Sequence, residues 1–215
     1  MDQQIEIERV QPVALVEEDS AKRQQIIEGA RRVFLAKGFD AASMNDINRA
    51  AGVSKGTLYV YFENKEKLFQ AICTQECDAQ AEGVFDFTDK QSDIEATLRR
   101  VGIAFVNFLC RPEKASTART VIAIAERMPE IGRAFYESGP QKGINHLAAY
   151  FRDQVAAGVL DIEEPEIAAA QFIESCHATL FKPMIFNFGA PPTQARIEQC
   201  VGIAVKTFLA AYRVR

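Results

Sequence analysis

Residues 43–69 read SMNDINRAAGVSKGTLYVYFENKEKLF, and their pattern sets the architecture of the whole chain. Ser43 is placed to cap a short helix, and Asp46 three residues later completes a capping-box pattern. Gly52 ends this helix, because glycine takes the left-handed conformation that follows a helix end at little steric cost. Ser54 is then placed to cap a second helix. The pattern predicts two short helices joined by a tight turn and followed directly by a longer helix.

The second short helix has an apolar side and a polar side. Leu58 and Phe62 lie four residues apart and share the face that we expect to be buried. The other side carries the hydrogen-bond donors of Lys55, Thr57, Tyr59 and Tyr61. Such groups donate to phosphates, and lysine also donates to guanine, so this surface suits a polyanion. A glycine-containing turn between two helices, the second of them polar, predicts a helix-turn-helix. The alternative is an ordinary helical hairpin whose tyrosines cover a core.

The predicted DNA contacts come from the starts of the helices and from the polar side of the second short helix. Gly56 lets the backbone approach a partner closely, and the amides at the start of the third helix form a phosphate site together with Lys65. The full predicted set is Ser43, Met44, Asn45, Ser54, Lys55, Gly56, Thr57, Tyr59, Tyr61 and Lys65.

Residues 20–69 resemble the DNA-binding domain of the TetR family of bacterial transcriptional repressors. The resemblance is carried by AGVSKGTLYVYFENKEKLF and, upstream of it, by Ile26, Ala30, Phe34, Gly38, Phe39 and Ile47. Val60 departs from the pattern, because many members carry histidine or a large aromatic residue there. This departure bears on which bases or phosphates are contacted. Residues 119–140, RTVIAIAERMPEIGRAFYESGP, resemble the corresponding region of the AefR-like subgroup.

Composition and charge describe a globular protein with one basic region. The 215 residues are 48% hydrophobic and 25% charged, and the formal net charge is −4. Residues 1–19 carry −5, residues 20–75 carry +4 and residues 76–215 carry −3. The basic balance is confined to the predicted helix-turn-helix, as expected if that region faces phosphates. The first ten residues lack the apolar core of a signal peptide, and no apolar run approaches the ~18 residues of a membrane span. Five cysteines at scattered positions favour a reducing cytoplasm.

These observations predict an all-α protein of two domains after an acidic tail. Residues 1–19 form the tail, which we expect to be disordered, residues 20–66 the DNA-binding domain and residues 67–215 a helical ligand-binding and dimerisation domain. The first helix is expected over residues 20–37. Helices after the motif are expected over residues 93–110, 112–128, 129–155 with a bend or break at 138–140, 166–184 with a kink or end near Pro183, and 193–213. The helix that begins at Lys65 continues into the second domain and could act as a lever.

Many aromatic side chains fall in the second domain, and the family resemblance implies a cavity for a small molecule there, often apolar or cationic. The predicted wall is Phe105, Phe108, Leu109, Arg127, Phe135, Tyr136, Tyr150, Phe172 and Cys176, with Phe181 assigned both to this wall and to the interface described next. Glu126, Arg127 and His146 are candidate polar anchors. The alternative is that these apolar stripes form an ordinary core.

The last two helices carry more apolar surface than one core face needs. By resemblance they pair with a second copy as a four-helix interface, through Phe181, Ile197, Val201, Val205 and Phe208. A single helix-turn-helix reads too few bases, whereas a twofold dimer reads two half-sites about 34–36 Å apart.

Other chemistry is poorly supported. Glu174 and His177 form only half of a di-iron carboxylate motif, which needs a second such pair and two more glutamates. Cys73 and Cys77 lie one helical turn apart and could bind a metal or sense oxidants, but buried inert thiols are the simpler interpretation. We therefore expect no enzyme, metal or cofactor, and no membrane partner. The predicted function is a cytoplasmic, dimeric repressor that binds a palindromic double-stranded DNA operator and responds to a small molecule. The alternatives are a helical protein-interaction module and a redox or metal sensor.

Overall fold

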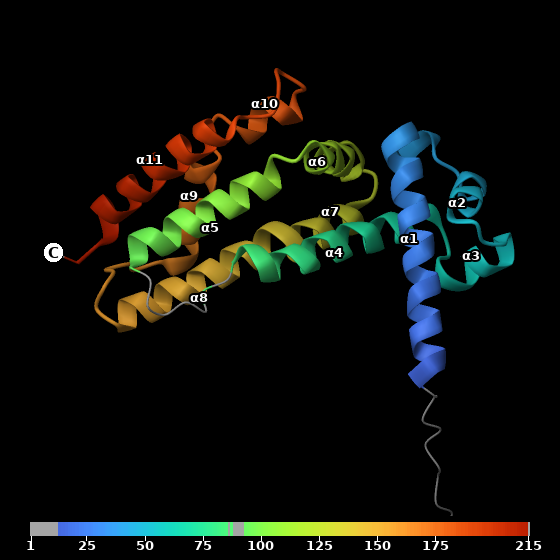
Figure 1. Cartoon of the computed structure of the whole chain (residues 1–215), viewed down its shortest axis with the longest axis horizontal. Helices are drawn as coiled ribbons and strands as arrows, with labels where there is room; N and C mark the ends of the chain where they lie inside the picture. Colours follow the sequence, from blue (N-terminus) through green and yellow to red (C-terminus); the bar gives the residue numbers. More distant parts are fainter. Residues whose placement is uncertain (1–12, 86, 88–92, 215) are drawn as a thin grey trace, which may run out of the picture. The chain divides into compact units, whose positions relative to one another are not determined.

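The computed structural model describes residues 13–85, 87 and 93–214, without the side chains of residues 13–18 and 76–83. Within those residues it contains helices and no strand, as Figure 1 shows, which confirms the predicted all-α fold. The helices are α1 (Val13–Ala41), α2 (Met44–Ala51), α3 (Lys55–Tyr61), α4 (Lys65–Val84), α5 (Ile94–Leu109), α6 (Pro112–Ile124), α7 (Pro129–Tyr136), the π-helix η1 (Glu137–Gln141), α8 (Lys142–Ala156), α9 (Pro165–Cys176), α10 (Phe181–Ile185) and α11 (Gln194–Tyr212).

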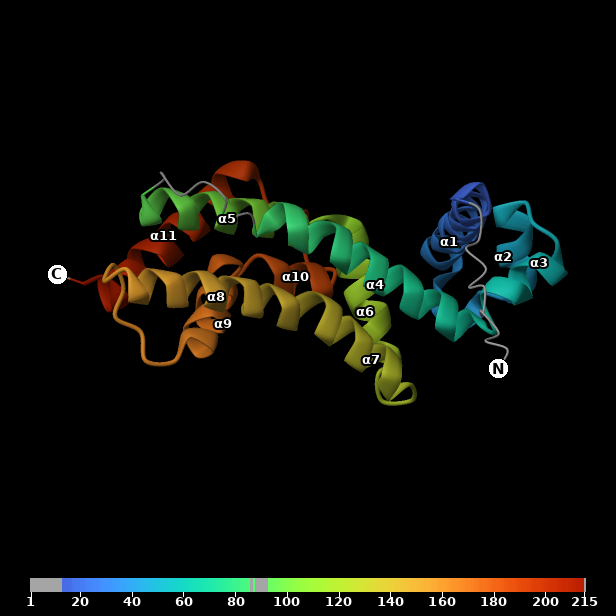
Figure 2. The same ribbon diagram turned by 90° about the horizontal axis from the view of Figure 1, so that it is seen from below.

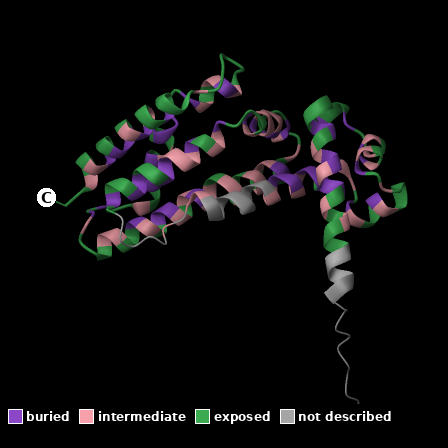
Figure 3. Cartoon of the chain, viewed as in Figure 1, coloured by how far each residue is buried: buried purple, intermediate pink, exposed green. Residues whose placement is uncertain are grey.

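The chain folds as two compact units, the first ending at Phe69 and the second beginning at Gln70. In the first unit α1 packs against α2, and Figure 3 shows buried stretches along α1. The inward side chains of α1, α2 and α3 include Ile26, Ile47 and Leu58, which are fully buried. The rings of Phe34, Phe39 and Phe69 join the end of α1 to the first turns of α4, with centroids 5.2–5.6 Å apart.

Helix α1 begins before its predicted start and is interrupted at Gly38, directly after its predicted end. It begins at Val13, so its helical backbone includes residues that were assigned to the acidic tail; the remainder of that predicted tail, residues 1–12, lies outside the described residues. Near its other end Gly38 has φ 76° and ψ 169°, which is not helical, before helical turns resume up to Ala41. A glycine adopts this conformation readily because it has no Cβ.

In the second unit α11 packs along α5 and α9, and α9 also packs against α8 (Figures 1 and 2). Their shared core contains Leu98, Leu147, Phe151, Phe172 and Phe208. The ring of Phe151 stacks on that of Phe208 at 4.7 Å between centroids. Apolar side chains buried in this way contribute about 1.5–3 kcal/mol each.

Helix α5 approaches α11 closely at Gly102. A Cβ atom at this position would lie 2.8 Å from Cγ1 of Val201 and 3.1 Å from Sγ of Cys176. These distances are too short for a real Cβ, so only a glycine at position 102 allows α5 and α11 to lie this close together.

The segment after α9 is organised differently from the prediction. One helix was expected over residues 166–184, but α9 ends at Cys176, and a turn precedes the short helix α10. Thr179 in this turn has φ 65°, a left-handed conformation that a right-handed helix does not continue through. Pro183 sits in the first turn of α10, where its missing N–H has no helical partner to lose.

Residues 138–140 also behave differently from a simple break. They lie in η1, which joins α7 to α8 and includes Pro140. A proline cannot donate the backbone hydrogen bond of an α-helix, and a wider π-turn accommodates this loss without ending the helix. The chain therefore runs from Pro129 to Ala156 as successive helical segments.

Candidate nucleic-acid interface and ligand cavity

The predicted caps of the two short helices are confirmed. The backbone N–H of Asp46 donates to Oγ of Ser43 at 3.1 Å, and the N–H of Ser43 donates to Oδ2 of Asp46 at 3.3 Å. Gly52 ends α2 with φ 65° and ψ 34°. The N–H of Thr57 donates to Oγ of Ser54 at 3.0 Å, which caps α3. The turn between α2 and α3 is thus fixed at both sides.

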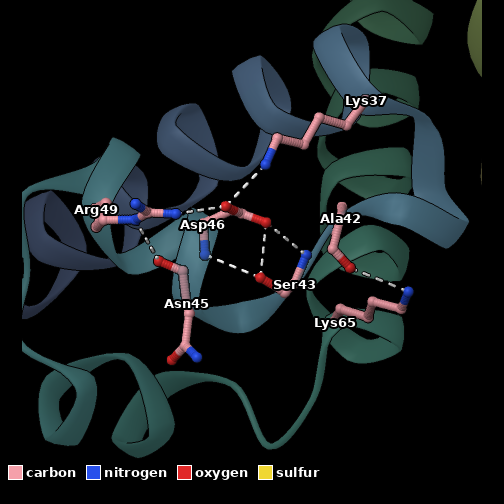
Figure 4. Close-up of polar contacts among 7 residues, drawn as sticks. All are labelled: Lys37, Ala42, Ser43, Asn45, Asp46, Arg49 and Lys65. Atoms are coloured by element: carbon pink, nitrogen blue, oxygen red, sulfur yellow. Dashed lines mark hydrogen bonds and ion pairs between the residues drawn. The ribbon is translucent and has the colours of Figure 1, made fainter.

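An ionic cluster around Asp46, drawn in Figure 4, fixes the start of α2 to the end of α1. Oδ1 of Asp46 lies 2.8 Å from Nζ of Lys37 and 2.7 Å from Nη2 of Arg49. Oγ of Ser43 donates to Oδ2 of Asp46 at 2.7 Å. These partners, Lys37 first and Ser43 next, hold the pKa of Asp46 well below its usual range. The sequence indicated the Ser43 partner through the capping box, but it gave no sign of Lys37.

The other end of α2 is tied to the middle of α1. Nε2 of Gln25 donates to the carbonyl of Ala51 at 2.7 Å, and Nη2 of Arg32 donates to the carbonyl of Ala50 at 2.6 Å. The last carbonyls of a helix lack partners within it, so these side chains satisfy groups that α2 cannot. Neither residue was predicted to have a role.

Helix α3 presents one side to solvent. Leu58 and Phe62 are buried as predicted, whereas Lys55 and Gly56 are exposed and Tyr59 is 45% exposed. Nζ of Lys55 lies 5.9 Å from the ring centroid of Tyr59, so the two donors share one surface. The hairpin alternative required the tyrosines to cover a core, and the exposed Tyr59 does not do so.

Several other predicted contacts are already engaged within the unit. The Tyr61 hydroxyl donates to Oδ1 of Asp19 at 2.7 Å, and the hydroxyls of Thr57 and Ser54 lie 2.8 Å apart. At the start of α2, Ser43 and Asn45 are exposed and Met44 is half-buried. Val60, the departure from the family pattern, is 81% exposed.

Lys65 requires a correction, because its ammonium group is used inside the protein. Nζ donates to the carbonyls of Phe39 at 2.9 Å, Asp40 at 3.1 Å and Ala42 at 3.2 Å, and the last of these bonds is drawn in Figure 4. It also lies 4.6 Å from the Phe39 ring centroid. An ammonium has three donors, and all three are taken, so Lys65 anchors α4 to the end of α1 rather than presenting a free phosphate ligand.

The second unit encloses a cavity of about 410 Å³, a volume suited to a small organic molecule. Five of the predicted wall residues line it: Phe105, Phe108, Leu109, Phe135 and Tyr136. Phe181 also lines the cavity, which places it there rather than on an outer interface. The lining also includes Phe85, Ile144, Ile173 and the buried Cys73.

Four residues assigned to the cavity lie elsewhere. Phe172 and Cys176 are buried in the core, where burial raises the pKa of the Cys176 thiol to about 12. Tyr150 stacks on Phe87 at 4.3 Å between centroids, and Arg127 is exposed outside the lining. The candidate anchors Glu126 and His146 are not part of the wall. A helical apolar stripe does not distinguish core from cavity, which explains these errors.

The polar groups that do line the cavity were not assigned to it by sequence. They include Lys114 and Thr117 of α6 and Glu174 and His177 at the end of α9. His177 Nε2 lies 3.5 Å from Oε1 of Glu174, and the ring stands near those of Phe105 and Phe181. Burial lowers the pKa of His177, against the opposing effect of Glu174, and so favours the neutral imidazole.

The metal and redox alternatives gain no support from the described part of the chain. No group of three or more His, Cys, Asp or Glu residues there is placed to hold a metal ion. Cys73 is buried and not part of a disulfide bond, and the side chain of Cys77 lies outside the described residues.

The predicted interface residues on α11 are also corrected. Ile197, Val201, Val205 and Phe208 are all buried in the core of their own unit. They form the strongest apolar stripe of α11, and that stripe packs on α5 and α9. The exposed apolar side chains nearby belong to other positions: Ile203 of α11, Ile167 of α9, and Phe186 and Phe188 after α10.

Both units match models of known protein families. Residues 26–72 match the bacterial regulatory proteins of the tetR family. Residues 96–214, more than half of the chain, match the C-terminal domain of the AefR-like transcriptional repressors. The chain belongs to the TetR family. Members are transcriptional regulators with an N-terminal helix-turn-helix DNA-binding domain and a C-terminal helical domain, and they are not enzymes.

Solved structures and sequence relatives agree with this TetR membership. A TetR-family regulator from Mesorhizobium loti superposes with a TM-score of 0.84 at 28% identity, covering 91% of this chain and 98% of that one. The flavonoid-responsive regulator FrrA superposes with a TM-score of 0.79 at 32% identity, and the match covers 91% of this chain and 99% of FrrA. The repressor AcnR of Corynebacterium diphtheriae is 37% identical over 73 residues, but this alignment spans only 34% of this chain and 38% of AcnR. In the described residues, no helix is both long and apolar enough to cross a bilayer.

Proposed function

We propose that this TetR-family regulator is a repressor that binds a palindromic operator as a homodimer, with α3 of each copy in a major groove. The observation that carries the proposal is the solvent-facing side of α3, where Lys55, Gly56 and Tyr59 are exposed while Leu58 and Phe62 hold the opposite side in the core. Lysine and tyrosine donors suit phosphates and guanine edges. This role requires access to the chromosome and hence a cytoplasmic location.

The test is a mobility-shift assay with duplex DNA from upstream of the protein's own gene. A protein that binds DNA through phosphate contacts releases counterions from the duplex. Its affinity for DNA should therefore fall log-linearly between 50 and 200 mM salt, by roughly 10³-fold or more. An affinity that does not depend on salt, or no retained fragment at all, would instead favour the protein-interaction module.

We infer that the dimer forms through exposed apolar side chains of the second unit. Ile203 is 59% exposed on α11, and Phe186 and Phe188 are more than three-quarters exposed beyond α10. A charge at Ile203 would have to be desolvated in an interface, so Ile203→Glu should shift the protein toward monomer in sedimentation equilibrium. Lys206→Glu, on an exposed position of the same helix, is the matched control. An unchanged dimer in the Ile203→Glu variant would exclude this surface.

We propose that the cavity binds the effector that releases the operator. FrrA is named as flavonoid-responsive, and its likeness to this chain supports an aromatic effector. The apolar wall of Phe105, Phe108 and Phe135 fits such a molecule. An effector acts as a switch only if it binds more tightly to the conformer that releases DNA, since equal affinity for both conformers shifts nothing. Loss of the shifted band on adding flavonoids, restored by their removal, is the corresponding assay.

A further inference from the structure

The charged groups of the cavity indicate which kind of effector it takes. The described lining contains one cation, Lys114 of α6, one anion, Glu174 of α9, and the neutral imidazole of His177. The remainder of the wall is largely aromatic and aliphatic. Such charges can still discriminate between bound molecules by the sign of the charge that each molecule carries.

Glu174 offers acceptor positions to a ligand. Its Oε1 is 3.5 Å from Nε2 of His177, longer than a typical N–H···O hydrogen bond. The side chain is 68% exposed, so its carboxylate is not closed off by the protein. His177 is only 9% exposed, and this burial favours its neutral form, which leaves the carboxylate charge in place. An ionised carboxylate only accepts hydrogen bonds.

The α6 side of the wall offers the opposite polarity. Nζ of Lys114 lies 4.8 Å from the ring centroid of Phe108, which keeps this donor against the aromatic wall. Oγ1 of Thr117 donates its proton to the carbonyl of Glu113 at 3.0 Å, so this proton is used within α6 and the positive donor on this side is Lys114. Helix α6 thus brings the positive donor Lys114 to the apolar cavity, and α9 brings the negative acceptor Glu174.

We infer that the cavity selects a neutral aromatic molecule whose hydroxyl donates to Glu174 and whose second oxygen accepts from Lys114. A ligand with a net charge would meet one like charge in either case, whereas a neutral dipolar ligand complements both groups. The rings of Phe105, Phe108 and Phe181 provide aromatic contacts for its body. This inference rests on the proposed function and replaces the predicted choice between apolar and cationic effectors.

Four biphenyls that share a 4′-methoxy group as the second oxygen test the inference by calorimetric titration at pH 7 without DNA; they differ at position 4, which carries a hydroxyl, a methoxy, a carboxylate or an aminomethyl group. The hydroxyl compound should bind most tightly, at least about tenfold better than its methoxy analogue, because a hydrogen bond to a carboxylate is among the stronger ones. Glu174→Met should reduce that ratio to within about threefold while the melting temperature is retained. Glu163→Met, at an exposed position outside the lining, should leave the ratio unchanged.

Three results would overturn the inference: tightest binding of the carboxylate or the amine, an undiminished preference in Glu174→Met, or no binding of any of the four. Operator binding is measured separately in the mobility-shift assay. Its absence together with a clear hydroxyl preference would reject the proposed function alone, and its presence without that preference would reject only the effector class.

Discussion

Nζ of Lys37 lies 2.8 Å from Oδ1 of Asp46, so an ion pair joins the last turns of α1 to the first turn of α2. Arg49 and Ser43 bind the same carboxylate, which makes Asp46 the hub of the start of the helix-turn-helix (Figure 4).

The contribution of Asp46 should depend on pH. Its pKa is lowered in the folded protein, so its interactions stabilise the fold above the unfolded value of about 4 and are lost as pH falls below it. Asp46→Asn should therefore lower the melting temperature at pH 7 and make a smaller difference at pH 3. The exposed Glu63→Gln is the control. A difference that grows toward acid would contradict the assignment.

Lys65→Met should destabilise the first unit. Three carbonyls would lose a charged donor, and a hydrogen bond to a charged group contributes about 1.5–3 kcal/mol. Urea unfolding of this variant should show a loss of that order, whereas Lys67→Met, at the exposed neighbouring lysine, should show little change. Weakened operator binding with undiminished stability would restore the phosphate contact that the sequence suggested.

Lys55→Ala should weaken operator binding without unfolding the protein. Lys55 is exposed, and within the part of the chain that the structure describes its side chain contacts only the ring of Tyr59. The free energy of unfolding should therefore stay within about 0.5 kcal/mol of the original. If Lys55 contacts a phosphate, affinity falls about equally on all sequences and the salt slope decreases by about 1. A loss confined to particular base changes would instead identify Lys55 as a reader of base edges.

Phe208→Ala should cost about 3–5 kcal/mol in the free energy of unfolding, because its ring is buried against Phe151 and Phe172. Thr207→Ala, at the exposed neighbouring position of α11, should be nearly neutral. Chemical denaturation of both variants checks the corrected role of this stripe. If Phe208→Ala separated the dimer and left each subunit as stable as before, the interface assigned from sequence would be reinstated.

Local patterns were predictable from the sequence and remote contacts were not. Caps at Ser43 and Ser54 and the stop at Gly52 depend on neighbours within a few residues, so spacing alone reveals them. The carbonyls bound by Lys65 lie more than twenty residues away, and no periodicity points to them. The left-handed residue in the turn after α9 is Thr179 rather than a glycine, so the sequence carries no signal for this turn.

The cavity shows the same limit in a different form. Phe105 and Phe172 both belong to apolar helical stripes, yet the first lines the cavity and the second fills the core. Periodicity states which side of a helix avoids water, but it does not state whether a void or another side chain lies opposite. The polar lining was missed because Glu174 and His177 suggested only an incomplete metal motif.

The fastening of Lys65 restricts how the DNA-binding helices are able to move. Its ammonium holds the first turn of α4 to the end of α1, while Asp46, Gln25 and Arg32 hold both ends of α2 to the same helix. Separating α2 from α1 would break the bonds of Asp46, Gln25 and Arg32 together. We therefore expect α1, α2 and the first turn of α4 to stay together as one rigid piece, so that the proposed release of the operator would come from its reorientation rather than from local unfolding.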